Sequence, residues 1–133
     1  MQYDEFIGQV QHRARLASSG EAVHAVHAVL QTLGERLYGE EAENLAAQLP
    51  AEIGFYLKQA EKREPLAVRE FFERIAGREG ADYPDAVYHA RAVMSVILDA
   101  VSPGEIADMR AQLPAEFNPL FQWSGEGGEQ RAA

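Results

Sequence analysis

The hexapeptide Ala-Gln-Leu-Pro-Ala-Glu occurs twice in this 133-residue chain, at residues 47–52 and again at residues 111–116. The two copies start 64 residues apart (111 − 47). At this offset the positions upstream also match in pairs: Glu41 with Glu105, Leu45 with Met109, Leu33 with Ile97, Leu30 with Met94, Val29 with Val93, Val23 with Val87, Ala22 with Ala86 and Glu21 with Asp85. Agreement over so long a stretch indicates a tandem duplication.

Apolar residues recur at helical spacing in both copies and predict four helices in each. The stripe of the first helix is Tyr3, Phe6, Ile7 and Val10 in one copy and Val68, Phe71, Phe72 and Ile75 in the other. The stripe of a longer second helix is Val23, Val26, Val29, Leu30, Leu33 and Leu37, matched by Val87, Ala90, Val93, Met94, Ile97 and Val101. No alternation typical of a strand occurs, so the sequence predicts an all-α protein.

Polar residues and prolines mark the ends of these predicted helices. Ser18 and Ser102 are placed to cap a helix, and Glu21 and Glu105, three residues further on, would complete capping boxes. The proline of each hexapeptide ends the third helix, because proline disfavours helical geometry in the residue before it. A short fourth helix is expected after each proline.

These elements predict one domain, residues 1–121, of eight or so helices. The first repeat spans about 3–57, a charged connector 58–65 and the second repeat about 66–121, while residues 122–133 are expected to form a flexible tail. Four short helices cannot bury their apolar faces well alone. We therefore expect the two repeats to pack about a pseudo-twofold axis with the long second helices at the centre. A homodimer would add a third and a fourth copy.

Composition narrows the classes of function. The chain has a net charge of −9 and no basic stripe, which disfavours nucleic acid as a partner. It has no cysteine, which excludes disulfides and thiolate chemistry and fits a cytoplasmic location. Its first residues lack the features of a signal peptide, and no apolar run approaches the roughly 20 residues that cross a bilayer, so no membrane association is expected.

The sequence resembles a family of bacterial proteins known as domain of unknown function 2267. The resemblance rests on the Glu-Phe starts at Glu5–Phe6 and Glu70–Phe71, on the step Ser102–Glu105 and on the doubled Gln-Leu-Pro-Ala-Glu. It covers residues 3–121 and implies an all-helical, cytoplasmic bacterial or archaeal protein without established activity. Such a family has no catalytic residues to transfer. The pair Asn118–Pro119 departs from the charged helix usual there.

Two histidines form a candidate metal site. His24 and His27 lie three residues apart on the predicted second helix, a spacing that lets both side chains face one ion. Further ligands would be needed, and His12 and Glu21 are the nearest candidates in the sequence. The alternative is that one histidine is exposed and the other partly packed. The duplication favours this alternative, because tyrosine and arginine stand at the matching positions of the second repeat.

Two further features allow a structural and a functional interpretation. In Gln48, Leu49 and Pro50, and in Gln112, Leu113 and Pro114, the structural interpretation is that leucine closes the core, proline stops the helix and glutamine satisfies backbone carbonyls at that end. The alternative is that the glutamines line a groove. Trp123 either folds back on the core or is an exposed anchor for a partner protein.

No residue pattern for catalysis was found, and we predict no catalytic residues and no cofactor. There is no nucleophile elbow and no glycine-rich phosphate loop. The leading hypothesis is a non-enzymatic module that binds another protein. The alternative is a protein that binds a small ligand or a metal at the repeat interface or near His24 and His27. A cavity with convergent polar groups would favour the alternative, and a flat exposed apolar patch the first hypothesis.

Overall fold

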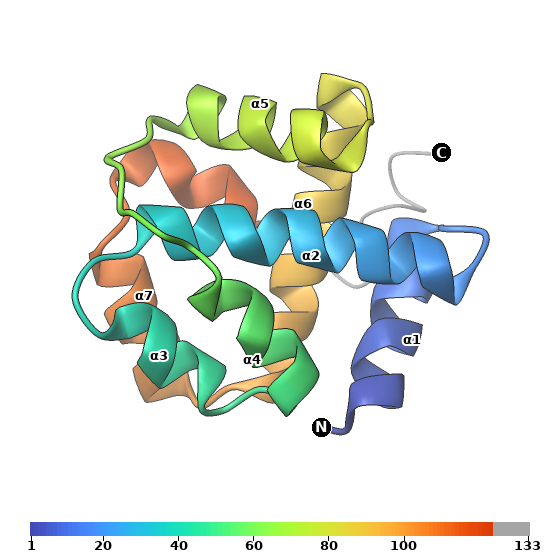
Figure 1. Ribbon diagram of the computed structural model, residues 1–133, viewed down its shortest axis with the longest axis horizontal. Helices are drawn as coiled ribbons and strands as arrows, with labels where there is room; N and C mark the ends of the chain where they lie inside the picture. Colours follow the sequence, from blue (N-terminus) through green and yellow to red (C-terminus); the bar gives the residue numbers. More distant parts are fainter. Residues whose placement is uncertain (124–133) are drawn as a thin grey trace.

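The computed structural model describes residues 1–123 and is all-helical over that range, as predicted (Figure 1). Its elements are α1 (Tyr3–Ala14), α2 (Ser19–Arg36), α3 (Glu41–Ala46), α4 (Ala51–Lys58), α5 (Val68–Glu79), α6 (Tyr83–Ala100), α7 (Pro103–Ala111) and the 3-10 helix η1 (Ala115–Phe121). The chain therefore forms four helices, the second of which is the longest, and then four more helices in the same order.

The last element of the second repeat, which the sequence predicted as a short helix, is a 3-10 helix, whereas its counterpart α4 is an α-helix. Pro119 lies inside η1, at the position that Phe55 holds in α4. Proline has no amide hydrogen and its ring clashes with the carbonyl one turn earlier, so an α-helix cannot continue through it. The departure of Asn118–Pro119 from the helical pattern accounts for this difference.

Helices of the two repeats pack against one another in a single core. The long helices α2 and α6 contact each other, α1 of the first repeat lies against α6, and α5 of the second repeat lies against α2 (Figure 1). One cluster of buried side chains draws on every helix, including Phe6, Val26, Leu33, Ile53, Phe71, Ile97, Met109 and Phe117. This packing supports the expectation that neither repeat buries its apolar face alone.

Both predicted serine caps are present, but within residues 1–123 neither predicted capping box has the second bond, from the serine amide to the glutamate side chain. The Ser18 hydroxyl accepts from the Glu21 amide at 3.1 Å, and the Ser102 hydroxyl accepts from the Glu105 amide at 3.3 Å. The Ser102 amide, which Glu105 would satisfy in a capping box, instead donates to Oε1 of Gln48 at 2.8 Å. A side chain from the other repeat has taken the place of the local partner.

The two hexapeptide glutamines make reciprocal bonds between the repeats. While Gln48 accepts from the Ser102 amide, Gln112 accepts from the Tyr38 amide at 2.7 Å and donates to the Tyr38 carbonyl at 3.2 Å. Tyr38 and Ser102 are themselves equivalent positions, 64 residues apart (102 − 38). Each glutamine thus binds the backbone of the opposite repeat, not the carbonyls of its own helix end. Of the two adjacent leucines, Leu49 is buried and Leu113 is partly buried.

We expect Gln112→Ala to lower the free energy of unfolding by about 1–2 kcal/mol. The substitution removes two hydrogen bonds, and each contributes about 1 kcal/mol, or less where it is exposed to water. Chemical denaturation measures the change. Gln9→Ala is the control, since the described residues show no hydrogen bond from the Gln9 side chain, and it should have little effect. Equal effects of the two substitutions would contradict the structural role of the reciprocal bonds.

Close contact between α2 and α4 depends on a glycine. A Cβ atom added to Gly34 would stand 2.2 Å from the carbonyl oxygen of Leu57. That distance is far inside van der Waals contact, so only a hydrogen atom fits between the two helices. The equivalent position in the second repeat is Leu98, and the element equivalent to α4 there is the 3-10 helix η1.

Candidate functional site

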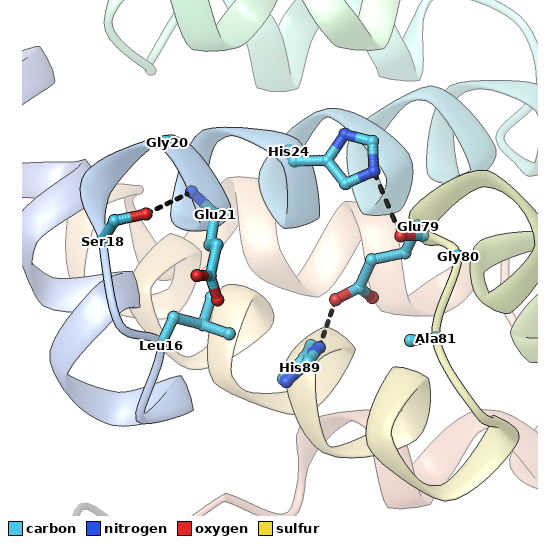
Figure 2. A pocket seen from close by; sticks show the side chains of 9 residues that line it. All are labelled: Leu16, Ser18, Gly20, Glu21, His24, Glu79, Gly80, Ala81 and His89. Carbon is cyan, nitrogen blue, oxygen red and sulfur yellow. Dashed lines mark hydrogen bonds and ion pairs between the residues drawn. The ribbon is translucent and has the colours of Figure 1, made fainter.

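A cleft of about 510 Å³ lies where the turn between α1 and α2 meets the turn between α5 and α6 (Figure 2). These are corresponding turns of the two repeats, so the cleft lies at the repeat interface. Its lining combines small or apolar residues with titratable ones: Leu16, Ser18, Gly20, Glu21, His24, Glu79, Gly80, Ala81 and His89. Figure 2 shows Glu79 reaching between His24 and His89, with Glu21 and Leu16 across the view from them.

The end of α5 determines where Glu79 lies. Gly80 has a φ of 73°, a left-handed conformation that glycine adopts without strain and that ends the helix. The amides of Gly80 and Ala81 both donate to the Ala76 carbonyl, at 2.9 and 3.1 Å. The chain therefore turns sharply after Glu79 and places this last helical residue at the cleft.

An ion-pair network holds the last turns of α5 against α2. Arg78 donates to Oε2 of Glu35 at 2.6 Å and to the Thr32 hydroxyl at 2.9 Å, and Arg74 bridges Glu35 and Glu64. The Glu35 side chain is only 12% exposed, so these contacts are largely shielded from water. The guanidinium of Arg78, next to Glu79 in sequence, thus pairs with Glu35.

Glu79 is a buried carboxylate with one oxygen bound and one unbound. Its side chain is 7% exposed, and its Oε2 accepts a short hydrogen bond from Nδ1 of His89. Its Oε1 is fully buried and has no hydrogen-bond partner among the described residues. A buried acceptor left without a donor costs about 1–3 kcal/mol, and more when it is charged. Glu79 is also one of the residues that line the cleft, so its carboxylate is a natural hydrogen-bond acceptor for a ligand there.

Both histidines at the cleft use one ring nitrogen to donate to Glu79. His24 Nε2 donates to the backbone carbonyl of Glu79 at 3.1 Å, and His89 Nδ1 donates to its carboxylate. A neutral imidazole that donates from one nitrogen is an acceptor at the other. With the rings neutral, His24 Nδ1 and His89 Nε2 are acceptors.

The two histidines of the predicted metal site line one small pocket of about 190 Å³ on α2, but their rings have different hydrogen-bond partners. His24 belongs to the cleft, whereas His27 contacts Gln59 Oε1 through Nε2 at 2.8 Å and stacks on Tyr56 with ring centroids 4.3 Å apart. Of the predicted further ligands, Glu21 lines the cleft and His12 does not. Within residues 1–123 no three His, Cys, Asp or Glu side chains are grouped so that they could hold a metal ion.

Trp123, the predicted plug or anchor, is half-buried against α6. Its ring lies 5.2 Å from that of Tyr88, whose hydroxyl donates to the Arg13 carbonyl at 2.9 Å. The nearby Gln122 carbonyl accepts from Arg91 at 2.8 Å. These contacts support the folded-back alternative, and the rest of the predicted tail, residues 124–133, lies outside the described residues.

Glu79 and His89 are central to the cleft, yet the sequence analysis named neither. One signal was available for Glu79. An acidic side chain in the last turn of a helix faces the negative end of the helix dipole, where a basic residue is preferred. Nothing in the sequence marks His89, which meets Glu79 only because the turn at Gly80 folds α6 back along α5.

A second pair of acidic groups lies where the repeats meet, away from the cleft. Glu41 on α3 and Glu105 on α7 are equivalent positions, and each has a buried carboxyl oxygen with no hydrogen-bond partner among residues 1–123. Burial and the neighbouring carboxylates of Glu105 and Asp108 raise the pKa of Glu41 to about 8. The Glu41 carboxyl therefore keeps its proton at neutral pH.

Comparison with known families agrees with the resemblance noted in the sequence. The sequence model of a family described as "Uncharacterized conserved protein (DUF2267)" matches residues 3–120. The chain belongs to this family. No curated protein matches the chain. Within residues 1–123, none of the helices is both long and apolar enough to span a membrane.

Proposed function

We propose that this protein binds a small molecule in the cleft between the α1–α2 and α5–α6 turns. The observation that carries the proposal is the buried carboxylate of Glu79, a residue that lines the cleft of about 510 Å³ and whose Oε1 has no hydrogen-bond partner in residues 1–123. Ligand sites are commonly concave, largely apolar and supplied with a few convergent polar groups. The cleft is both at the repeat interface and beside His24, which the sequence analysis named as alternative places for a ligand.

The competing hypothesis, a module that binds another protein, has weaker support. The large apolar side chains that are exposed within residues 1–123 are Met1, Tyr38 and Phe55, which belong to three different segments. Single exposed apolar residues are ordinary on soluble domains. Polar groups that converge on a cleft are the more specific feature, so ligand binding is the function we put forward.

A fragment titration followed by amide NMR tests this proposal. We expect small neutral, cationic and anionic fragments, taken as one library, to yield binders that shift the amides of Gly20, Gly80 and Ala81. Ala81→Leu should abolish these shifts, because the larger side chain occupies the cleft. Ala107→Leu, at an exposed position on α7, is the matched control and should leave binding intact. If no fragment of any charge binds at the cleft, the proposal fails.

A further inference from the structure

We infer that the ligand of this cleft is an organic cation, an alkylammonium or guanidinium group that donates to Glu79; this inference rests on the proposed function. Recognition would centre on the Glu79 carboxylate, with His89 beside it and Glu21 at the exposed rim. The apolar part of the ligand would lie on Leu16 and Ala81.

Apart from the Ser18 hydroxyl, which can both donate and accept, the polar side chains that line the cleft offer acceptors. Glu79 and Glu21 are carboxylates, and the two imidazoles already use one N–H each on Glu79, which leaves acceptor nitrogens when the rings are neutral. A ligand that brings several N–H donors fits this set, whereas a ligand rich in acceptors leaves the carboxylates unpaired. Ammonium and guanidinium groups carry only donors.

The helix ends at the cleft also favour a positively charged ligand. The C-terminus of the 12-residue helix α5 directs its partial negative charge toward the site. The N-terminus of α2 also lies at the cleft, and its partial positive charge would attract an anion. However, its first turn is already capped by Ser18 and carries the negative charge of Glu21. The adjacent cation, Arg78, is paired with Glu35. The local field thus favours a positively charged ligand.

A bare metal ion fits less well than an organic cation. A metal needs three or more ligands at a common distance of about 2 Å, and within the described residues no such group of side chains occurs. The acceptors at the cleft are instead spread over a cavity of about 510 Å³. An organic cation spans such a volume with its carbon skeleton while its charged end meets Glu79.

Four probes with short alkyl chains differ in the charge of their head groups: n-butylamine, n-butylguanidine, 1-butanol and butyrate. Binding to the full chain is measured at pH 7.5 by NMR titration of the cleft amides. We expect the two cations to bind at least tenfold more tightly than 1-butanol, and butyrate to bind most weakly. Equal affinity for the amine and the alcohol would overturn the inference, while the absence of binding by all probes and library fragments would instead refute the proposed function.

The general negative charge of the protein also attracts cations, so substitutions must localise the effect. Glu79→Gln keeps an acceptor for His89 and should weaken butylamine binding at least tenfold without changing 1-butanol binding. Glu73→Gln removes the same charge from an exposed position of α5 and should change the affinity less than twofold. Glu21→Gln, at the exposed rim, should give a smaller loss of about two- to threefold and provides a test should Glu79→Gln fold poorly.

Two outcomes would contradict the assignment. If Glu73→Gln weakens butylamine binding as much as Glu79→Gln, the amine is held by the diffuse charge of the surface. If Zn²⁺ alone binds at one equivalent and is lost in His24→Ala, the acceptors serve a metal and not an organic cation.

Discussion

Gly34→Ala is expected to lower the free energy of unfolding by roughly 3 kcal/mol, which would reduce the melting temperature by about 10 °C. The new methyl group would meet the Leu57 carbonyl oxygen at 2.2 Å, and the nearby carbonyl carbon at 3.1 Å. Both atoms belong to the backbone of α4, so no side chain can rotate away. The helices α2 and α4 must separate, and the buried side chains between them lose contact.

The same substitution elsewhere in a helix provides the control. A Cβ added to Gly77 of α5 meets nothing within 4 Å, and alanine favours helices over glycine by up to about 1 kcal/mol. Gly77→Ala should therefore raise the melting temperature slightly. A neutral or stabilising effect of Gly34→Ala, measured by calorimetry, would show that the two helices do not pack as closely as described.

Replacing Glu41 by glutamine should stabilise the protein at pH 8 and above and have little effect near pH 4. The pKa of Glu41 is raised to about 8 by its burial and by the neighbouring Glu105 and Asp108. A carboxyl whose pKa is higher in the folded than in the unfolded state contributes stability below its unfolded pKa, near 4.5, and loses it as the pH rises through about 8. The unfolding free energy of the native protein should thus fall over this window, by at most about 1.4 kcal/mol per pH unit.

Glutamine has no proton to lose, so the variant should show a flatter pH profile. Chemical denaturation between pH 4 and pH 9 measures both profiles. Glu43→Gln, an exposed position on the same helix, should leave the slope unchanged. Parallel profiles for the native protein and Glu41→Gln would refute the raised pKa of Glu41.

Local patterns in the sequence predicted the helices well, because apolar spacing and polar caps act within a few residues. The stripes beginning at Tyr3 and Val68, the serine caps and the proline stops all agree with the structure. The predicted bond from the Ser102 amide to the Glu105 side chain was wrong, because the residue that replaces Glu105 is distant in the sequence. The expected local partner of Glu105, the Ser102 amide, is bound by Gln48, which is 54 residues away, and such a competitor is not visible in a short motif.

The cleft could be predicted only in part. The sequence drew attention to His24 and Glu21, which do line it, but paired His24 with His27 on the strength of helical spacing. The actual partner, Glu79, follows from how the α5–α6 turn packs against α2, which depends on Gly80 and on the contacts of Arg78 with Glu35. The spacing of side chains within one helix does not predict which residues of the other repeat will pack beside them.

The reciprocal glutamine bonds join equivalent positions of the two repeats, and this pairing also bears on how the cleft is formed. Two separate copies of one repeat, assembled as a symmetric dimer, would present identical side chains from both sides of any site at their junction. Fusion into one chain removes that constraint. Here His24 of one half corresponds to Tyr88 of the other, and His89 to Ala25, so the two halves present different chemistry across a shared boundary. The sequence similarity of the two halves thus does not make the two walls of the cleft chemically alike.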